Sequence, residues 1–138
     1  MTVIAAVTDN RQGHLALVQA ITEAERFGTD VVAVNLANTT LDLTGIDTRG
    51  VTVQVVDRRA KDNQDSADMI LDEITAREAT RLVIGIKRRT PVGKAILGSM
   101  SQTLLLNAPV PVVAVKLPEG ELSGGAFELP SGIRQVTG

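Results

Sequence analysis

The chain has 138 residues, of which 43% are hydrophobic, and this length and composition predict one domain with an aliphatic core. Two Phe are its only aromatic residues and its formal net charge is −2, which excludes both a base-stacking platform and a strongly basic surface for nucleic acid or anionic membranes. The absence of cysteine excludes a disulfide framework, a thiolate nucleophile and a Cys-based metal site. The first apolar run stops at Thr8 and Asp9, too early for a signal peptide or a membrane span, so we expect a cytoplasmic protein.

Short apolar runs alternate with helical patterns along most of the chain. Continuous runs of Val, Ile, Leu and Ala are typical of strands buried on both faces of a parallel sheet. Five strands are therefore expected, at residues 3–7, 31–36, 51–56, 82–85 and 112–115. Three helices are expected between them: one carrying Leu17, Val18, Ile21 and Ala24 and closed by Gly28 as its C′ residue, one over residues 62–78, and one carrying Leu104, Leu105 and Ala108 before Pro109.

This alternation predicts an α/β domain over residues 1–116, with helices covering both faces of a mostly parallel sheet. Residues 117–138 are rich in glycine and show no period, so we interpret them as a flexible C-terminal tail. Ligands of such sheets bind at the carboxyl ends of the strands, where the strand order reverses. Asp9 follows the first strand and Gly85 ends the predicted fourth, so both converge on that crevice if these strands are neighbours.

The segment 85–99 combines glycines with a cluster of cationic side chains, which suggests an anion site, most simply for phosphate. Two standard phosphate motifs fail on it. A P-loop would need glycine at Arg88 and a hydroxyl residue at Ala95, and a dinucleotide motif beginning at Gly85 meets Lys87 and Thr90.

A third pattern fits better. Gly85 and the pair Gly98-Ser99 stand at the correct separation for the motif Gly, two residues, Gly, nine residues, Gly-Ser or Gly-Thr. With Asp9 after the first strand and a terminal Val-rich strand, the chain resembles the universal stress protein family over about residues 2–116. It departs from the motif at the middle glycine, which is Arg88 here. We accordingly expect a five-stranded parallel sheet in the order 3-2-1-4-5.

The resemblance implies a site for an adenine nucleotide, ATP or AMP, with Mg²⁺ as a possible companion. It implies that Asp9 contacts the ribose, that Val7 or Thr8 lines the base, and that Leu36 meets adenine through its backbone. It also implies that the phosphates and ribose are surrounded by Gly85, Gly98, Ser99 and Met100. Glycines allow backbone N–H groups to approach phosphate oxygens, and a helix beginning at Gly98-Ser99 offers free donors.

Each of these residues also has a purely structural interpretation. Asp9 could be the N-cap of the first helix. Ser99 and Gln102 form a capping-box pattern. Gly85 and Gly98 could serve turn geometry alone. The basic residues 87–89 and 58–61 could be solvated loops, and Arg88 could either fill the phosphate pocket or bind phosphate bidentately.

No hydrolase or metalloprotease motif is present, and the lone His14 makes a metal site improbable. Three hypotheses follow: a nucleotide-binding stress-response module that acts through partners; a nucleotide-independent interaction protein of the same fold, with Arg88 occluding the pocket; and a weak ATPase. Members of the family often dimerise through the last strand, and residues 112–115 form an apolar edge strand, so we expect a homodimer through antiparallel pairing of that strand.

Overall fold

The computed structural model of the protein describes residues 1–57, 65–87 and 98–117. Its elements are β1 (Thr2–Val7), α1 (Arg11–Phe27), β2 (Asp30–Asn35), β3 (Val53–Asp57), α2 (Ser66–Ala76), β4 (Arg81–Lys87), α3 (Ser99–Asn107) and β5 (Val112–Leu117). The strands among these residues form one five-stranded parallel sheet in the order β3-β2-β1-β4-β5. The predicted fold class and strand order are confirmed.

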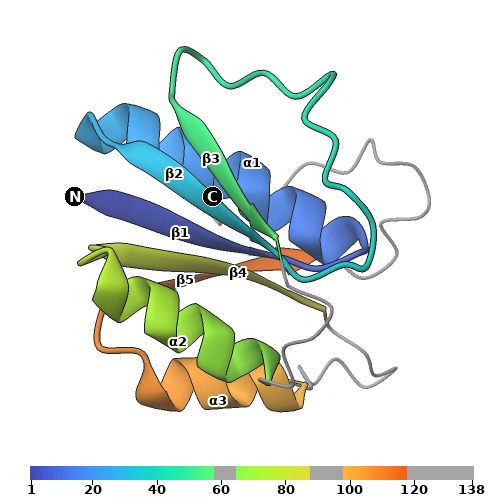
Figure 1. The fold of residues 1–138 in the computed structure, drawn as a ribbon, viewed down its shortest axis with the longest axis vertical. Helices are drawn as coiled ribbons and strands as arrows, with labels where there is room; N and C mark the ends of the chain where they lie inside the picture. Colours follow the sequence, from blue (N-terminus) through green and yellow to red (C-terminus); the bar gives the residue numbers. More distant parts are fainter. Residues whose placement is uncertain (58–64, 88–97, 118–138) are drawn as a thin grey trace.

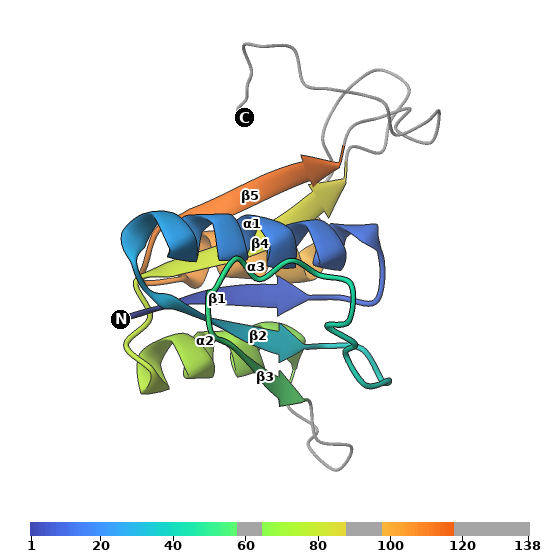
Figure 2. The same cartoon turned by 90° about the horizontal axis from the view of Figure 1, so that it is seen from above.

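Helices cover both faces of this sheet, as predicted (Figure 1). α1 packs on one face, and α2 and α3 lie together on the other. β1 is central and all of its side chains are buried, which explains the continuous apolar run from Val3 to Val7. β3 and β5 are the two edge strands (Figure 2), and β3 is only partly buried.

α1 presents an apolar stripe to the sheet, formed by Ala16, Leu17, Ala20, Ile21 and Ala24. Val18, which the helical pattern placed among the inward residues, is 38% exposed because it lies outside that stripe. Gly28 ends the helix in the left-handed region at φ 67°, which confirms its prediction as the closing glycine.

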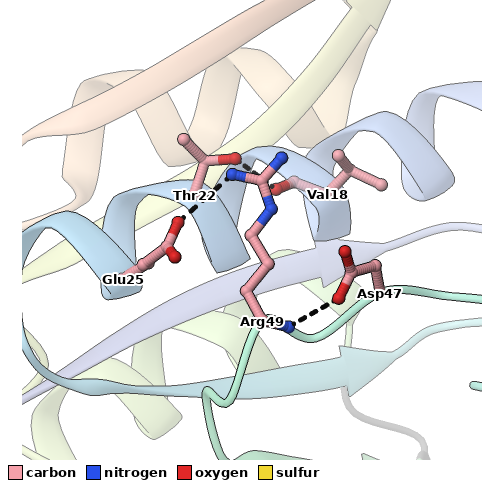
Figure 3. A network of polar contacts seen from close by, with 5 residues as sticks. All are labelled: Val18, Thr22, Glu25, Asp47 and Arg49. Carbon is pink, nitrogen blue, oxygen red and sulfur yellow. Dashed lines mark hydrogen bonds and ion pairs between the residues drawn. The ribbon is translucent and has the colours of Figure 1, made fainter.

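The connection between β2 and β3 covers part of the α1 face, although it contains no helix (Figure 1). Its apolar residues Leu41, Leu43, Ile46 and Val51 pack against the core cluster beneath α1. Figure 3 shows how it is tied to α1: the Arg49 guanidinium contacts the Glu25 carboxylate at 3.2 Å. Within the connection itself, the Arg49 backbone N–H donates to Asp47. The same connection holds Asp42, whose pKa is lowered by hydrogen bonds from the Thr44 side chain and backbone.

The helical spacing over residues 62–78 predicts Ala67, Ile70, Leu71 and Ile74 on the inward face. α2 buries Ala67, Ile70 and Ile74, whereas Leu71 is only partly buried. The helix begins at Ser66 rather than at residue 62, because the Asp65 carboxylate accepts from the Ala67 backbone N–H at 3.1 Å and caps it there. α3 ends at Asn107, so Ala108 is its C-cap. None of the helices in the described ranges is long and apolar enough to span a membrane.

Candidate functional site

The turn after β1 is held rigidly by Asn10. Its side-chain oxygen accepts from the Thr8 hydroxyl at 2.7 Å and from the Gly13 backbone N–H at 3.0 Å. Asn10 is therefore the N-cap of α1, and the alternative in which Asp9 caps this helix is wrong. Asp9 lies exposed at the tip of the turn, and its carboxylate has no hydrogen bond or ion pair within the described residues. A charge displayed in this way is available to a ligand.

The two residues before Asp9 differ in what they can contact. Val7 is only 4% exposed and packs in the core cluster beneath α1. Thr8 is partly exposed. Thr8 is thus the member of this pair whose side chain can reach a ligand at the carboxyl edge of the sheet.

Gly85 has a packing role that the sequence pattern did not reveal. The prediction that Gly85 ends β4 is wrong, because the strand continues to Lys87 and its last residues pair with β5. A Cβ on Gly85 would lie 2.2 Å from the Gln12 carbonyl oxygen, and a Cβ on Gly13 would lie 2.0 Å from the Thr8 carbonyl oxygen. These two glycines let the first turn of α1 sit directly on β4 and on the turn after β1.

Gly98 is different, because neither backbone conformation nor space requires glycine there. Its φ of −70° is accessible to any residue, and within the described chain no atom lies within 4 Å of its ideal Cβ position. Gly98 is the N-cap of α3 and has no side chain to bond the helix. Of the interpretations considered for Gly98, turn geometry therefore has no support in the structure.

The N-terminus of α3 has no capping partner in the part of the chain that the structure describes. Ser99 is the first helical residue rather than the cap, so the capping box with Gln102 is wrong; the Gln102 backbone N–H donates to the Gly98 carbonyl oxygen at 3.0 Å. The N–H groups of Ser99 and Met100 have no acceptor among the described residues. α3 begins at the carboxyl edge of the sheet, where Figure 1 shows the strands ending. Free N–H donors at a helix start form a favourable environment for an anion.

The end of β2 contains a polar group that sequence analysis missed. Asn35 is 2% exposed, and its side chain bonds Ala37, Thr39 and Asp57. The backbone N–H of the next residue, Leu36, donates to the Val7 carbonyl oxygen at 2.9 Å. The available signal was a single amide residue closing an otherwise apolar run.

A hollow of about 610 Å³ lies at the opposite, amino edge of the sheet, between the end of α1 and the residues before β3. Its charged side chains are already engaged: Glu25 with Arg49, and Asp30 with the Thr2 hydroxyl. This hollow therefore has fewer charged side chains available to bind a ligand than the carboxyl edge has.

Comparison with known proteins identifies the family. The model of the universal stress protein family matches residues 48–116. A universal stress protein from Mycolicibacterium smegmatis is 34% identical over 119 residues, which cover 78% of this chain and 91% of the relative. The chain belongs to the universal stress protein family.

Solved structures of universal stress proteins share the fold. One from Archaeoglobus fulgidus has a TM-score of 0.66 and 26% identity, and covers 84% of this chain and 98% of its own. A structure of the universal stress protein from A. fulgidus in complex with dAMP has a TM-score of 0.60 and 22% identity, and covers 84% of this chain and 98% of its own. The predicted family is confirmed.

Several sequence predictions for this universal stress protein lie outside the described residues. They include Arg88, the basic residues 58–61 and 89, and the tail, of which only Leu117 is described, as the last residue of β5. Of the predicted site residues, Thr8, Asp9, Gly98, Ser99 and the backbone of Met100 stand at the carboxyl edge, whereas the side chains of Val7 and Met100 contribute to the core.

Proposed function

We propose that this universal stress protein binds an adenine nucleotide at the carboxyl edge of its sheet and acts through protein partners in the stress response. The observation that carries the proposal is the start of α3. Within residues 1–57, 65–87 and 98–117, neither backbone conformation nor packing requires glycine at position 98, and no acceptor reaches the N–H groups of Ser99 and Met100. A ligand phosphate supplies the acceptor that these donors lack and uses the space that a side chain at Gly98 would fill.

The ribose and the base of the nucleotide would contact the residues that follow β1 and β2. The exposed Asp9 carboxylate accepts from the ribose hydroxyls, since a carboxylate has lone pairs for both. Thr8 and the backbone that follows β2 line the base. This assignment uses the Asn10-capped turn as a rigid support, because Thr8 and Gly13 both bond the Asn10 side chain.

Two further points support the proposal. The A. fulgidus relative with the same fold was solved with dAMP, an adenine nucleotide. In addition, segment 85–99 of this chain carries basic residues where the motif places the phosphates. Arg88 is assigned a bidentate contact to phosphate in place of the motif's middle glycine. Mg²⁺ would accompany ATP through the phosphate oxygens and neutralise part of their charge.

The proposal includes a homodimer formed through residues 112–115. β5 occupies an end of the sheet order and pairs only with β4 among the described strands, so the hydrogen-bonding groups on its outer side are open to a second copy. Antiparallel pairing of two such strands would satisfy them. A cytoplasmic location belongs to the same proposal and is tested by cell fractionation.

The first test is mass spectrometry of the small molecules released from purified, undialysed protein, followed by calorimetric titration with ATP and AMP. We expect co-purified adenine nucleotide or a dissociation constant in the micromolar range. A protein that is empty and ignores both nucleotides at millimolar concentration would instead support the nucleotide-independent interaction protein. Steady ATP turnover lost in Asp9→Ala would support the weak ATPase.

A further inference from the structure

An aromatic ring and a guanidinium lie together where α1 ends and β4 begins. Phe27, the last residue of α1, is 49% exposed. The guanidinium carbon of Arg81, the first residue of β4, lies 4.9 Å from the centre of the Phe27 ring. Arg81 Nε contacts the Glu23 carboxylate at 3.6 Å, and the Gln19 side-chain amide donates to the same carboxylate at 3.1 Å. These contacts hold the guanidinium against the ring.

Arg26, Phe27 and Arg81, which we call the α1–β4 corner, have the features of a binding surface. The carboxylate that holds Arg81 is buried, since Glu23 is only 7% exposed, whereas the Arg81 side chain is 30% exposed. Aromatic residues and arginine are enriched at the energetically important positions of protein interfaces. A ring and a guanidinium that are already fixed lose little freedom when a partner binds.

The corner carries an excess of positive charge. Arg26, in the last turn of α1, is exposed and has no hydrogen bond or ion pair among the residues that the structure describes. Arg26 and Arg81 carry two positive charges, and Glu23 offsets one of them. Glu25, the other acid nearby in α1, is already paired with Arg49. The corner therefore suits a partner segment that presents carboxylates together with an apolar side chain.

In the proposed dimer, the C-terminal segment of the partner subunit begins beside this corner. Arg81 stands one residue before the first pair of β4 with β5, and Figure 2 shows α1 ending at the edge of the sheet where β5 begins. Antiparallel pairing through residues 112–115 sets the last residue of the partner's β5 beside this amino end, about 10 Å, or two strand spacings, from β4. The chain's own residue 118 follows the opposite end of β5, about 20 Å away.

The sequence after β5 has the chemistry that the corner requires. Residues 118–122, which lie outside the described ranges, read Pro-Glu-Gly-Glu-Leu. Glu119 and Glu121 supply carboxylates, which form charge-assisted hydrogen bonds with arginine. Leu122 supplies an apolar side chain for the exposed ring of Phe27. Five extended residues span about 16 Å, which is enough to reach the corner from the end of the partner's β5.

We propose that residues 118–122 of each subunit bind the α1–β4 corner of the other, so that two exchanged C-terminal arms hold the dimer together with β5. The inference rests on the homodimer included in the proposed function and assigns it a second contact surface. The partner's arm is the occupant because it begins beside the corner and carries the opposite charge.

The first test measures the dimer dissociation constant of the whole chain by analytical ultracentrifugation. Glu121→Arg and Arg26→Glu each place like charges at both contacts of the dimer, so each should raise the constant by about tenfold. Glu128→Arg makes the same charge change outside the arm and should stay within about twofold of the wild type. Phe27→Ala should raise the constant by about tenfold, whereas Val18→Ala, at another exposed apolar residue of α1, should not.

Mixing the two charge-reversed chains decides whether the arms are exchanged. In a mixed dimer of Arg26→Glu with Glu121→Arg, each arm meets a corner of opposite charge, whereas both contacts are repulsive in each parent dimer. We expect native mass spectrometry to find the mixed dimer well above the half that random pairing gives. Arg26→Glu mixed with Glu128→Arg has the same net charges and should show no such excess. An arm that binds its own subunit would give no excess in either mixture.

The outcomes separate this inference from the proposed function. If the wild type is dimeric and Glu121→Arg dissociates no more readily than Glu128→Arg, the inference is overturned and the dimer through β5 stands. The same holds if Phe27→Ala behaves like Val18→Ala, or if the mixed dimer shows no excess over the control mixture. If the wild type is monomeric, the proposed dimer fails and the inference fails with it. Nucleotide binding is unaffected by either result, because the corner lies at the amino edge of the sheet and α3 begins at the carboxyl edge.

Discussion

Gly85 in β4 lies directly against Gln12 in the first turn of α1, so closely that a Cβ on Gly85 would be 2.2 Å from the Gln12 carbonyl oxygen. The contact joins α1 to the strand that leads into the basic segment 85–99. Because Gly13 makes a similar approach to Thr8, both strands beside the proposed site meet the same helical turn. A glycine that belongs to a nucleotide-binding motif therefore has a packing function in this chain.

Gly85→Ala should destabilise the fold itself. The added methyl group meets backbone atoms that cannot rotate away, so α1 or β4 must move. We expect the free energy of unfolding to fall by about 2 kcal/mol or more, measured by urea denaturation at equilibrium. A variant as stable as the wild type would show that α1 shifts freely and that this contact does not constrain the site.

Gly98→Ala is the matched control for stability and a separate test of the site. No described atom lies near its Cβ position, so the free energy of unfolding should change by less than about 1 kcal/mol, the range of a glycine-to-alanine change at an N-cap. Affinity for ATP should nevertheless fall by about tenfold, since the methyl group enters the space assigned to phosphate. Unchanged affinity would remove Gly98 from the site.

Asp9→Ala should lower the affinity for ATP by about tenfold, because the ribose contact is lost. The stability of the variant should equal that of the wild type, because the Asp9 carboxylate is exposed. The sharper measurement adds 2′,3′-dideoxy-ATP, which lacks both hydroxyls. The wild type and Asp9→Ala should bind this analogue equally. An equal loss for ATP and for the analogue would mean that Asp9 acts on the ligand in some way other than through the ribose.

Arg88→Gly restores the glycine of the family motif and tests which role the arginine has. If Arg88 binds phosphate, ATP affinity should fall by about tenfold and become less sensitive to salt. Arg89→Gly is the neighbouring control for a general loss of positive charge. A gain of affinity in Arg88→Gly would contradict the proposal and support occlusion of the pocket.

Ala114→Pro tests the proposed dimer. The Pro111 carbonyl accepts from Leu82 of β4, and successive residues of a strand point their N–H groups to opposite sides, so the Ala114 N–H faces away from β4. Proline removes that outward donor and leaves the bonds to β4 in place. We expect a monomer by light scattering, with Ala114→Ser remaining dimeric. A dimer that persists in Ala114→Pro, or a monomeric wild type, contradicts pairing through this strand.

Much of the fold could be predicted from local patterns. The apolar residues of β1 and β2 are buried as expected, and so are Ile70 and Ile74, which the helical spacing in α2 predicted. Gly28 closes α1, also as expected. The first residues of the helices were harder to predict, because neighbouring residues could each be the N-cap. The N-cap of α1 is Asn10 rather than Asp9, and that of α3 is Gly98 rather than Ser99. A cap depends on backbone angles and on which N–H group the side chain reaches, and neither is visible in a residue type.

The sequence by itself determined the α/β class, the family and the position of the motif residues along the chain, because these follow from hydrophobic period and residue spacing. Only the tertiary structure decided that Gly85 is a packing residue while Gly98 is free for another role. It also brought Asn35 and Asp57 together across two strands. The physical reason is that close backbone contacts and buried hydrogen bonds join residues distant in sequence, and no local pattern records which pairs the fold will bring within a few ångströms.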